Sequence, residues 1–458
     1  MINIAPETPP TNALTGVTVA LFGTFDVPNY GDCLFPLIVK NEIEKQFGQV
    51  NLYPFSPTSA VPQISDYPKV YSFNEITEVF PQPPTGFIIG GGALLNTEYS
   101  LSLWPQIRNI LYPNGLKYWL LPIMIGKAWG CPVIFNAVGG SVFSDAFNDI
   151  GARYLNKLDL CLVREEFTAK RLRSLNVNNE VAPDCGVVLP ELLASDRWDL
   201  RYRLLSSSLG LPGRFIVAQA SFYIQRYFTA FTNAVADIAL KAKLPVVLLP
   251  ICHHISDNAS LKIMRRMLDA RGVETHLVTG ILKTLDTSAI LAKSQIYIGT
   301  SLHGTLTSLA FRRPAIAFNP SERSKHRGAL RVIDLEICNC SDVSDIPLRA
   351  VELMKLPINY FDSRIQVAAN KVHDYFSRMG DIIRVKRAPA IPEGWAQDRL
   401  TGMIECPGIN DFDILNNLCR KKSREINFAK AIILYLIRKH RFTGEFFDMM
   451  KFRLRNRV

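Results

Sequence analysis

The chain has 458 residues, of which 48% are hydrophobic and 20% charged, so it can bury large cores and is neither disordered nor fibrous. Its formal net charge of +11 is concentrated at one end, because residues 420–458 hold twelve Lys and Arg against three acids. The rest of the chain is therefore nearly neutral, and we expect no nucleic-acid partner.

The length predicts two or three domains. Residues 1–16 lack the basic and apolar parts of a secretory signal, and no later stretch approaches the ~20 apolar residues of a spanning helix. The nine Cys include no CxxC pair, and no ligand partner stands at zinc-site spacing from the close pair Cys338 and Cys340. We expect a cytoplasmic protein with reduced thiols, no metal site and no cofactor.

Short apolar runs alternate with helix-like stretches from residue 17 to residue 188, which is typical of an α/β domain. The expected strands are residues 17–22, 86–89, 133–136, 158–163 and one near Val181, and the expected helices include residues 33–47 and 166–175. The segment 195–213 is charged and then bears Ser, Gly and Pro, so it is interpreted as a link between domains.

A second series of strands follows, at residues 215–218, 245–249, 275–278, 295–299 and 315–318. The chain is therefore predicted to have an α/β fold of two Rossmann-like domains facing across a cleft, residues 17–195 and 213–335, after an N-terminal tail, residues 1–16. Residues 336–385 are predicted to be a helical return segment, with a helix at 362–379 that packs back on the core.

Residues 386–458 are predicted to be a Pro-rich linker and a basic, helical, amphipathic C-terminal extension. Its apolar run, residues 431–437, is far too short to span a bilayer and is flanked by basic clusters. This extension either lies on an anionic membrane surface or docks on the protein with its basic face in solvent.

Residues 296–319 read as one strand–helix–strand unit, in which His303 follows the end of the first strand and the helix begins near Gly304 or Thr305. Ligands bind beyond the carboxyl ends of parallel strands, where the first amides of the next helix favour an anion. His303 is therefore either a candidate catalytic residue or a residue that caps the helix.

The loop after the first strand carries Asn29, Gly31 and Asp32. Asp32 is placed to cap a helix that begins at Cys33, or to accept a proton from a sugar hydroxyl. Residues 90–92, three glycines that end another strand run, allow a close approach of backbone to a ligand. They do not form the GxGxxG pattern, so a dinucleotide is not expected.

Arg164 follows the strand 158–163 and offers a planar fork for a carboxylate or phosphate. The alternative is a structural ion pair with Glu165 or Asp184.

Ionisable residues also follow two strands of the second series. His253, His254 and Asp257 come after the strand 245–249, where polar substrate contacts or turn capping are favoured over a metal because no third-ligand pattern accompanies them. After the strand 315–318, Lys325 and His326 add positive charge beside the cleft or form a solvated basic turn.

These motifs, in this order, resemble the polysaccharide pyruvyl transferase family. The matching residues are 29–32, 90–92, 163–165, 183–184, 250–257, 299–304 and 324–326. The resemblance implies a two-domain GT-B-type fold that moves the enolpyruvyl unit of phosphoenolpyruvate onto a sugar of a cell-surface or exopolysaccharide precursor, forming a pyruvate ketal. The family often has an Arg two positions before its His, where this chain has Ser301.

The resemblance also implies roles for the strand-end residues. His303 would protonate the methylene carbon of the donor, Arg164 would clamp its carboxylate or phosphate, and Asp32 would orient or deprotonate the acceptor. Substrate contacts are expected from Asn29, Gly31, Gly91, Gly92, Ser301, Leu302, Lys325 and His254.

The implied partners are phosphoenolpyruvate as donor substrate and a sugar or lipid-linked oligosaccharide as acceptor. A lipid-linked acceptor would give the basic extension a role in holding the enzyme peripherally at the inner face of the membrane. Two alternatives stay open: a GT-B glycosyltransferase that uses a nucleotide sugar, and a non-catalytic glycan-binding protein of the same fold.

Overall fold

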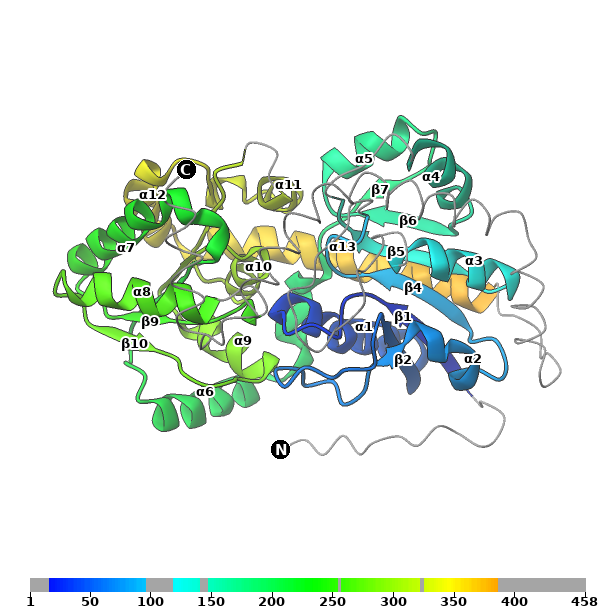
Figure 1. Ribbon diagram of the computed structural model, residues 1–458, viewed down its shortest axis with the longest axis horizontal. Helices are drawn as coiled ribbons and strands as arrows, with labels where there is room; N and C mark the ends of the chain where they lie inside the picture. The colour runs from blue at the N-terminus through cyan, green and yellow to red at the C-terminus, as the bar shows by residue number, and fades with distance from the viewer. Residues whose placement is uncertain (1–15, 96–117, 141–146, 254–256, 322–324, 386–458) are drawn as a thin grey trace, which may run out of the picture.

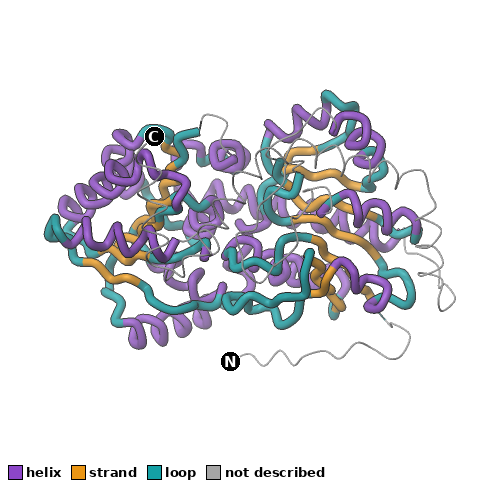
Figure 2. The backbone as a smooth tube through the Cα atoms, in the orientation of Figure 1, coloured by secondary structure: helices purple, strands orange, loops and turns teal. Residues whose placement is uncertain are grey.

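The computed structural model describes residues 16–95, 118–140, 147–253, 257–321 and 325–385. It contains two parallel sheets side by side, each covered by helices (Figure 1). Figure 2 shows the strands of the two sheets as separate groups inside layers of helix. The expected C-terminal extension and most of the expected N-terminal tail lie outside the described residues.

The first sheet has seven strands in the order β3-β2-β1-β4-β5-β6-β7. Its strands are β1 (Val17–Phe22), β2 (Val50–Ser56), β3 (Tyr71–Ser72), β4 (Gly86–Gly90), β5 (Val133–Val138), β6 (Leu160–Val163) and β7 (Glu180–Val181). The helices of this domain are α1 (Tyr30–Phe47), η1 (Phe73–Glu75), α2 (Ile76–Val79), α3 (Leu120–Ala128), α4 (Phe147–Leu155), α5 (Glu166–Arg173) and η3 (Cys185–Leu192). The central strands read as continuous apolar runs because helices bury both faces of the sheet.

The second sheet has six strands in the order β10-β9-β8-β11-β12-β13. Its strands are β8 (Ile216–Gln219), β9 (Val246–Leu248), β10 (Thr275–Leu277), β11 (Ile296–Gly299), β12 (Ala315–Phe318) and β13 (Asn339–Cys340). Its helices, with the connections on either side, are α6 (Ser195–Leu209), η4 (Phe222–Tyr227), α7 (Phe228–Ala242), α8 (Asp257–Asp269), α9 (Thr284–Lys293), α10 (Leu302–Ala310), α11 (Lys325–Val332), η6 (Glu336–Cys338), η7 (Val343–Asp345), α12 (Ile346–Lys355) and α13 (Ile358–Val385). In both sheets the order reverses at the first strand, which is the point where α/β folds bind ligands.

Every expected strand is present, but the sequence did not predict β2, β3 and β13. β2 contains Pro54, which argues against an inner strand because proline cannot donate to the ladder. The neighbouring strand β3 pairs only with Phe55 and Ser56, so Pro54 lies just before that ladder begins. β13 pairs with β12 and follows residue 335, so the second sheet extends past the domain boundary that we expected.

Three expectations about local structure were wrong. The supposed link at residues 195–213 is largely helix α6, which buries Trp198 against Phe311 and ends at Gly210 in a left-handed conformation. Helix α1 begins at Tyr30, so Asp32 lies inside its first turn and does not cap it. Helix α10 begins at Leu302 because the Ser301 hydroxyl accepts a hydrogen bond from the Gly304 amide.

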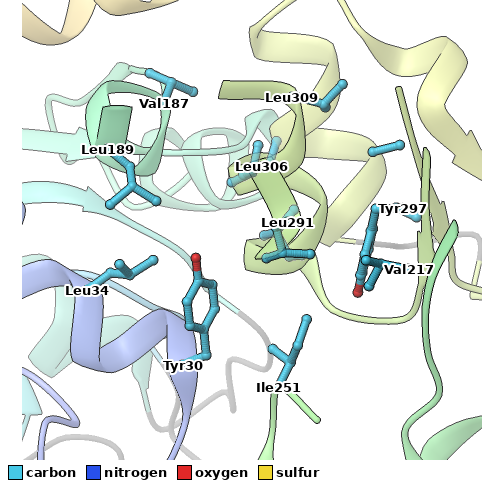
Figure 3. Close-up of a cluster of buried hydrophobic side chains, with 14 of the residues drawn as sticks. Tyr30, Leu34, Val187, Leu189, Val217, Ile251, Leu291, Tyr297, Leu306 and Leu309 are labelled. Atoms are coloured by element: carbon cyan, nitrogen blue, oxygen red, sulfur yellow. The ribbon is translucent and has the colours of Figure 1, made fainter. Parts of the chain in front are cut away.

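One continuous apolar core joins the two domains. Figure 3 shows Tyr30 and Leu34 of α1 and Leu189 of η3 facing Leu291 of α9 and Leu306 of α10. The Tyr30 hydroxyl lies 2.8 Å from the Ser288 hydroxyl and 2.8 Å from the Thr307 hydroxyl, both in the second domain. The two domains are therefore packed directly on each other.

Helix α13 adds a second connection, because it runs from the second domain along the back of the first (Figure 1). His373 lies 3.0 Å from Glu42 and 3.1 Å from Glu191 through its two ring nitrogens. Further along the helix, Ile383 packs on Gly86, where a β-carbon would lie 3.1 Å from its side chain. Among the described residues, no helix is long and apolar enough to cross a bilayer.

We expect Tyr30→Phe to lower the free energy of unfolding by about 1–3 kcal/mol, because it removes a buried hydroxyl that bonds to Ser288 and Thr307 across the domain interface. Thermal and urea unfolding measure this loss. Tyr227→Phe, at a half-exposed position with no such contacts, is the matched control and should leave stability unchanged. Equal effects of the two changes would contradict the role of the Tyr30 hydroxyl.

Candidate active site

A cavity of about 580 Å³ lies between the domains, at the carboxyl ends of strands from both sheets. Eight of the residues expected from the sequence line it: Asn29, Asp32, Gly92, Arg164, Ser301, Leu302, His303 and Lys325. Gly31 and Gly91 lie behind this wall, and His254 lies outside the described residues. The motifs that are far apart in the chain thus meet at one place.

Gly31 and Gly91, behind the cavity wall, leave room for the rings of His303 and Phe35. A β-carbon on Gly31 would lie 1.8 Å from the His303 Nδ1 atom, so the ring rests directly on the backbone of helix α1. Gly91 has a φ of +90°, and a β-carbon there would lie 2.1 Å from Phe35, whose ring packs edge-on against His303 at 5.3 Å. Both glycines therefore shape the site by packing against protein side chains, whereas the sequence suggested contact with substrate.

A single buried carboxylate, that of Asp184, connects His303 with Arg164. Its Oδ2 atom lies 2.9 Å from Arg164 Nη1 and 3.6 Å from His303 Nε2, and its Oδ1 atom accepts a hydrogen bond from the Gly186 amide. The longer distance is that of an ion pair and exceeds hydrogen-bonding range. Burial alone would raise the pKa of Asp184, but His303 and Arg164 together hold it well below its usual range.

Arg164 has two acidic partners, because Glu165 Oε2 lies 3.4 Å from its Nε atom. Burial would lower the pKa of this guanidinium, but the charges of Asp184 and Glu165 outweigh burial and raise it. The ion pairs that the sequence left as an alternative are thus present. Arg164 is 1% exposed and still contributes to the cavity wall, so an ion-paired guanidinium borders the cavity.

On the first domain, Asp32 is oriented by its neighbour. The Asn29 side-chain amide donates a 2.7 Å hydrogen bond to Asp32 Oδ2, and its oxygen accepts from the Cys252 thiol of the second domain. Asn29 and Cys252 also form an antiparallel bridge between the two domains. Gly92, with a φ of +87°, leaves room for Asp32 Oδ1. A β-carbon on Gly92 would lie 3.1 Å from that oxygen.

On the second domain, Gln219 and Asp257 hold in place the loops that carry Thr300 and Cys252. Gln219 was not expected from the sequence. The Gln219 oxygen accepts from the Thr300 amide at 2.9 Å, and its amide donates to Asp257 Oδ2 at 2.8 Å. The same carboxylate oxygen accepts from the amides of Ile251 and Cys252. Gln219 is a polar residue that ends an apolar strand, which is the signal that located the other site residues.

His326 is a structural residue of this wall. Asn319 must direct its amide nitrogen at His326, because its oxygen accepts from the Ser321 amide. His326 Nδ1 therefore accepts at 2.9 Å, and Nε2 donates to the Thr300 carbonyl at 3.1 Å. Burial lowers the pKa of His326 to about 3, so this ring is neutral and does not add the positive charge that the sequence suggested.

The profile of the polysaccharide pyruvyl transferases matches residues 29–322, which is more than half of the chain. The chain belongs to the polysaccharide pyruvyl transferase family. The match begins at Asn29 and includes Arg164 and His303. Among curated proteins, no sequence matches this transferase.

This transferase shares the GT-B fold with a solved structure. It is similar to a putative UDP-N-acetylglucosamine 2-epimerase from Listeria monocytogenes, with 12% identity, 80% of this chain and 94% of that chain covered, and a TM-score of 0.51. A UDP-GlcNAc 2-epimerase from Neisseria meningitidis gives 12% identity, coverage of 80% and 99%, and a TM-score of 0.49. An O-GlcNAc transferase mutant from Thermobaculum terrenum gives 12% identity, coverage of 87% and 71%, and a TM-score of 0.40.

Outside the cavity, Glu42, Glu191 and His373 bring metal-ligating atoms within 4.8 Å of one another. The Lys45 ammonium already lies 2.6 Å from each of the two carboxylates. This group is an ion-pair cluster that connects helix α13 with helix α1. Lys45 already supplies positive charge to its two carboxylates.

We expect Gly31→Ala to destabilise this transferase by about 1–3 kcal/mol, because the added methyl would overlap the His303 ring across the domain interface. Thermal unfolding measures the effect. Gly213→Ala, where a β-carbon would meet no atom within 4 Å, is the matched control and should leave stability unchanged. A Gly31→Ala protein as stable as this control would show that His303 lies elsewhere.

Asp257 predicts a pH dependence of stability. Burial raises its pKa from 3.8 to about 6, so this group favours folding below pH 4 and the contribution is lost as the pH rises through 6. Asp257→Asn keeps an acceptor oxygen and removes the buried charge. We expect the variant to be more stable than the wild type at pH 8 by about 1–3 kcal/mol and equal to it at pH 4.

Urea unfolding at the two pH values measures the difference. The pKa of Asp26 is also raised to about 6 by burial, but this group titrates in both proteins and cancels in the comparison. A wild type that is the more stable protein at pH 8 would contradict the prediction, since it would mean that the ionised carboxylate stabilises the loops.

Proposed function

We propose that this protein transfers the enolpyruvyl unit of phosphoenolpyruvate onto a sugar of a cell-surface or exopolysaccharide precursor and leaves a pyruvate ketal. One observation supports this most: basic residues of both domains, Arg164, His303 and Lys325, line the same cavity as the carboxylate of Asp32. A small polyanion needs several cations but no nucleotide pocket, and its acceptor needs a base.

The cavity suits a small anionic donor and part of a sugar, since its volume of about 580 Å³ lies within the range of ligand sites. Asp184 and Glu165 already pair with Arg164, so its guanidinium is fixed in direction and offers only its remaining donors. Lys325 has no hydrogen bond or ion pair with any other described residue. Its whole charge is therefore available to the donor.

The reaction requires a proton for the methylene carbon, which leaves a cationic centre at the neighbouring carbon. A sugar hydroxyl attacks that centre, phosphate leaves, and a second hydroxyl closes the ketal. Asp32 is proposed as the base for the attacking hydroxyl, because Asn29 fixes its carboxylate at the cavity wall. The sequence suggested His303 as the group that gives the proton to the methylene carbon.

The acceptor is proposed to be a sugar or a lipid-linked oligosaccharide, and the scheme needs neither a cofactor nor a metal. A lipid-linked acceptor would place the enzyme peripherally at an inner membrane face, where the basic residues 420–458 could meet anionic lipid. The competing function is transfer from a nucleotide sugar. Such enzymes often hold the ribose with an acid of the second domain, and no described residue of that domain brings a carboxylate to the cavity wall.

The proposal is tested by incubating the purified protein with phosphoenolpyruvate and soluble sugar acceptors, then measuring phosphate release and pyruvylated product by mass spectrometry. We expect phosphate release only with acceptor, and a loss of turnover of about 10²–10⁴-fold in Asp32→Asn. Glu180→Gln, at a surface ion pair that is not part of the cavity wall, is the control and should retain activity. Nucleotide release from UDP-sugars without use of phosphoenolpyruvate would favour the competing function.

A further inference from the structure

Lys325 stands at a fixed position between the two domains. It is the first residue of helix α11 and lines the cavity. The next residue, His326, is hydrogen-bonded through both ring nitrogens. One turn on, Gly328 packs on Glu165 of the first domain, where a β-carbon would lie 2.7 Å from the Glu165 side chain. Contacts from both domains therefore fix the start of helix α11, and with it the backbone of Lys325.

Other ionisable groups of the cavity wall are already engaged. His326 is neutral with both nitrogens bonded, and Arg164 is ion-paired and does not give up its proton. The Cys252 thiol donates to Asn29, and burial raises its pKa well above the usual range.

His303 makes no hydrogen bond to the described residues, but its two nitrogens point at the protein. Its Nε2 atom is buried and faces Asp184 at 3.6 Å, and its Nδ1 edge rests on Gly31. Both nitrogens thus face protein groups. Lys325 differs from these residues, because its ammonium is exposed to the cavity and has no partner among the described residues.

The groups around Lys325 lower its pKa. Desolvation between the domains and then the positive charge of Arg164 lower its pKa, while Cys252, Asp32 and Glu165 oppose this. The side chain keeps access to solvent, so desolvation acts on it only in part. A lowered pKa makes it easier for a lysine both to give and to take a proton within one turnover.

We propose that Lys325 is the catalytic acid and base of the transfer, an inference that rests on the proposed function. Its ammonium gives a proton to the methylene carbon, whose π pair forms the new C–H bond and leaves the adjacent carbon cationic. A sugar hydroxyl attacks that carbon and gives its proton to Asp32. The bond from carbon to the phosphate oxygen then breaks, and phosphate leaves with the bonding pair and takes the proton from Asp32.

A second hydroxyl closes the ketal and gives its proton to the neutral amine of Lys325, which restores the ammonium. In this scheme His303, held against Asp184, helps to bind the negative charge of the donor. The two hydroxyl protons balance the reaction: in net terms one ends on the new methyl group and the other on phosphate.

Three variants test the inference. Lys325→Arg keeps the charge but cannot release a proton, so it should still bind phosphoenolpyruvate in titration calorimetry while turnover falls by about 10²–10⁴-fold. Lys325→Gln should lose both binding and turnover. Lys325→Ala should regain part of its turnover when ethylamine is added. Arg327→Gln, an exposed residue on the same helix that pairs with Glu336, is the matched control and should keep full activity.

Turnover in Lys325→Arg within twofold of the wild type would overturn the inference and leave Lys325 as an anion-binding residue only. So would a Lys325→Ala protein that binds the donor but is not rescued by ethylamine. Both results leave the proposed function intact, because the wild type still consumes phosphoenolpyruvate. A wild type that releases no phosphate with any acceptor overturns the proposed function, and the inference falls with it.

Discussion

The buried carboxylate of Asp184 is the contact on which the site depends. It connects Arg164, at the end of a strand of the first sheet, with His303, at the start of a helix of the second domain. Removing one member of such a group leaves a buried charge without compensation, which costs about 3–5 kcal/mol. Because Asp184 also accepts from the Gly186 amide, the backbone helps to fix the position of its carboxylate.

The tight domain interface follows from the same arrangement. Helix α1 meets the second domain through a glycine at position 31, and the space of the missing side chain is filled by the His303 ring. Tyr30, its neighbour, reaches two hydroxyls of the second domain. Because the His303 ring rests on the opposite domain, this part of the cavity wall forms only where the two domains are packed together.

Much of the site was predictable because polar residues at the ends of apolar strands stand out in the sequence. Asp32, Arg164 and His303 were found this way, and the parallel sheets bring them together. The same rule could have identified Gln219, which ends strand β8, but no cluster of charged residues follows it. The rule could not show that Gly31 and Gly91 make room for side chains, because that depends on which helix faces them.

Helix α6 and strand β2 were missed for different reasons. The sequence of α6 is rich in charge and serine, and its helical state depends on burying Trp198 in a neighbouring domain. β2 carries a proline that is tolerated only because β3 pairs with the residues after it. In both cases the deciding contact lies far away in the chain, where local propensity gives no information.

The serine at position 301, where the family often has an arginine, can now be explained by the geometry. Its hydroxyl caps helix α10 through the Gly304 amide, a contact that an arginine side chain cannot make because it has no acceptor. Lys325, the first residue of helix α11, lines the same cavity and supplies positive charge there. At that position a lysine can release a proton, whereas an arginine at position 301 could only have bound an anion.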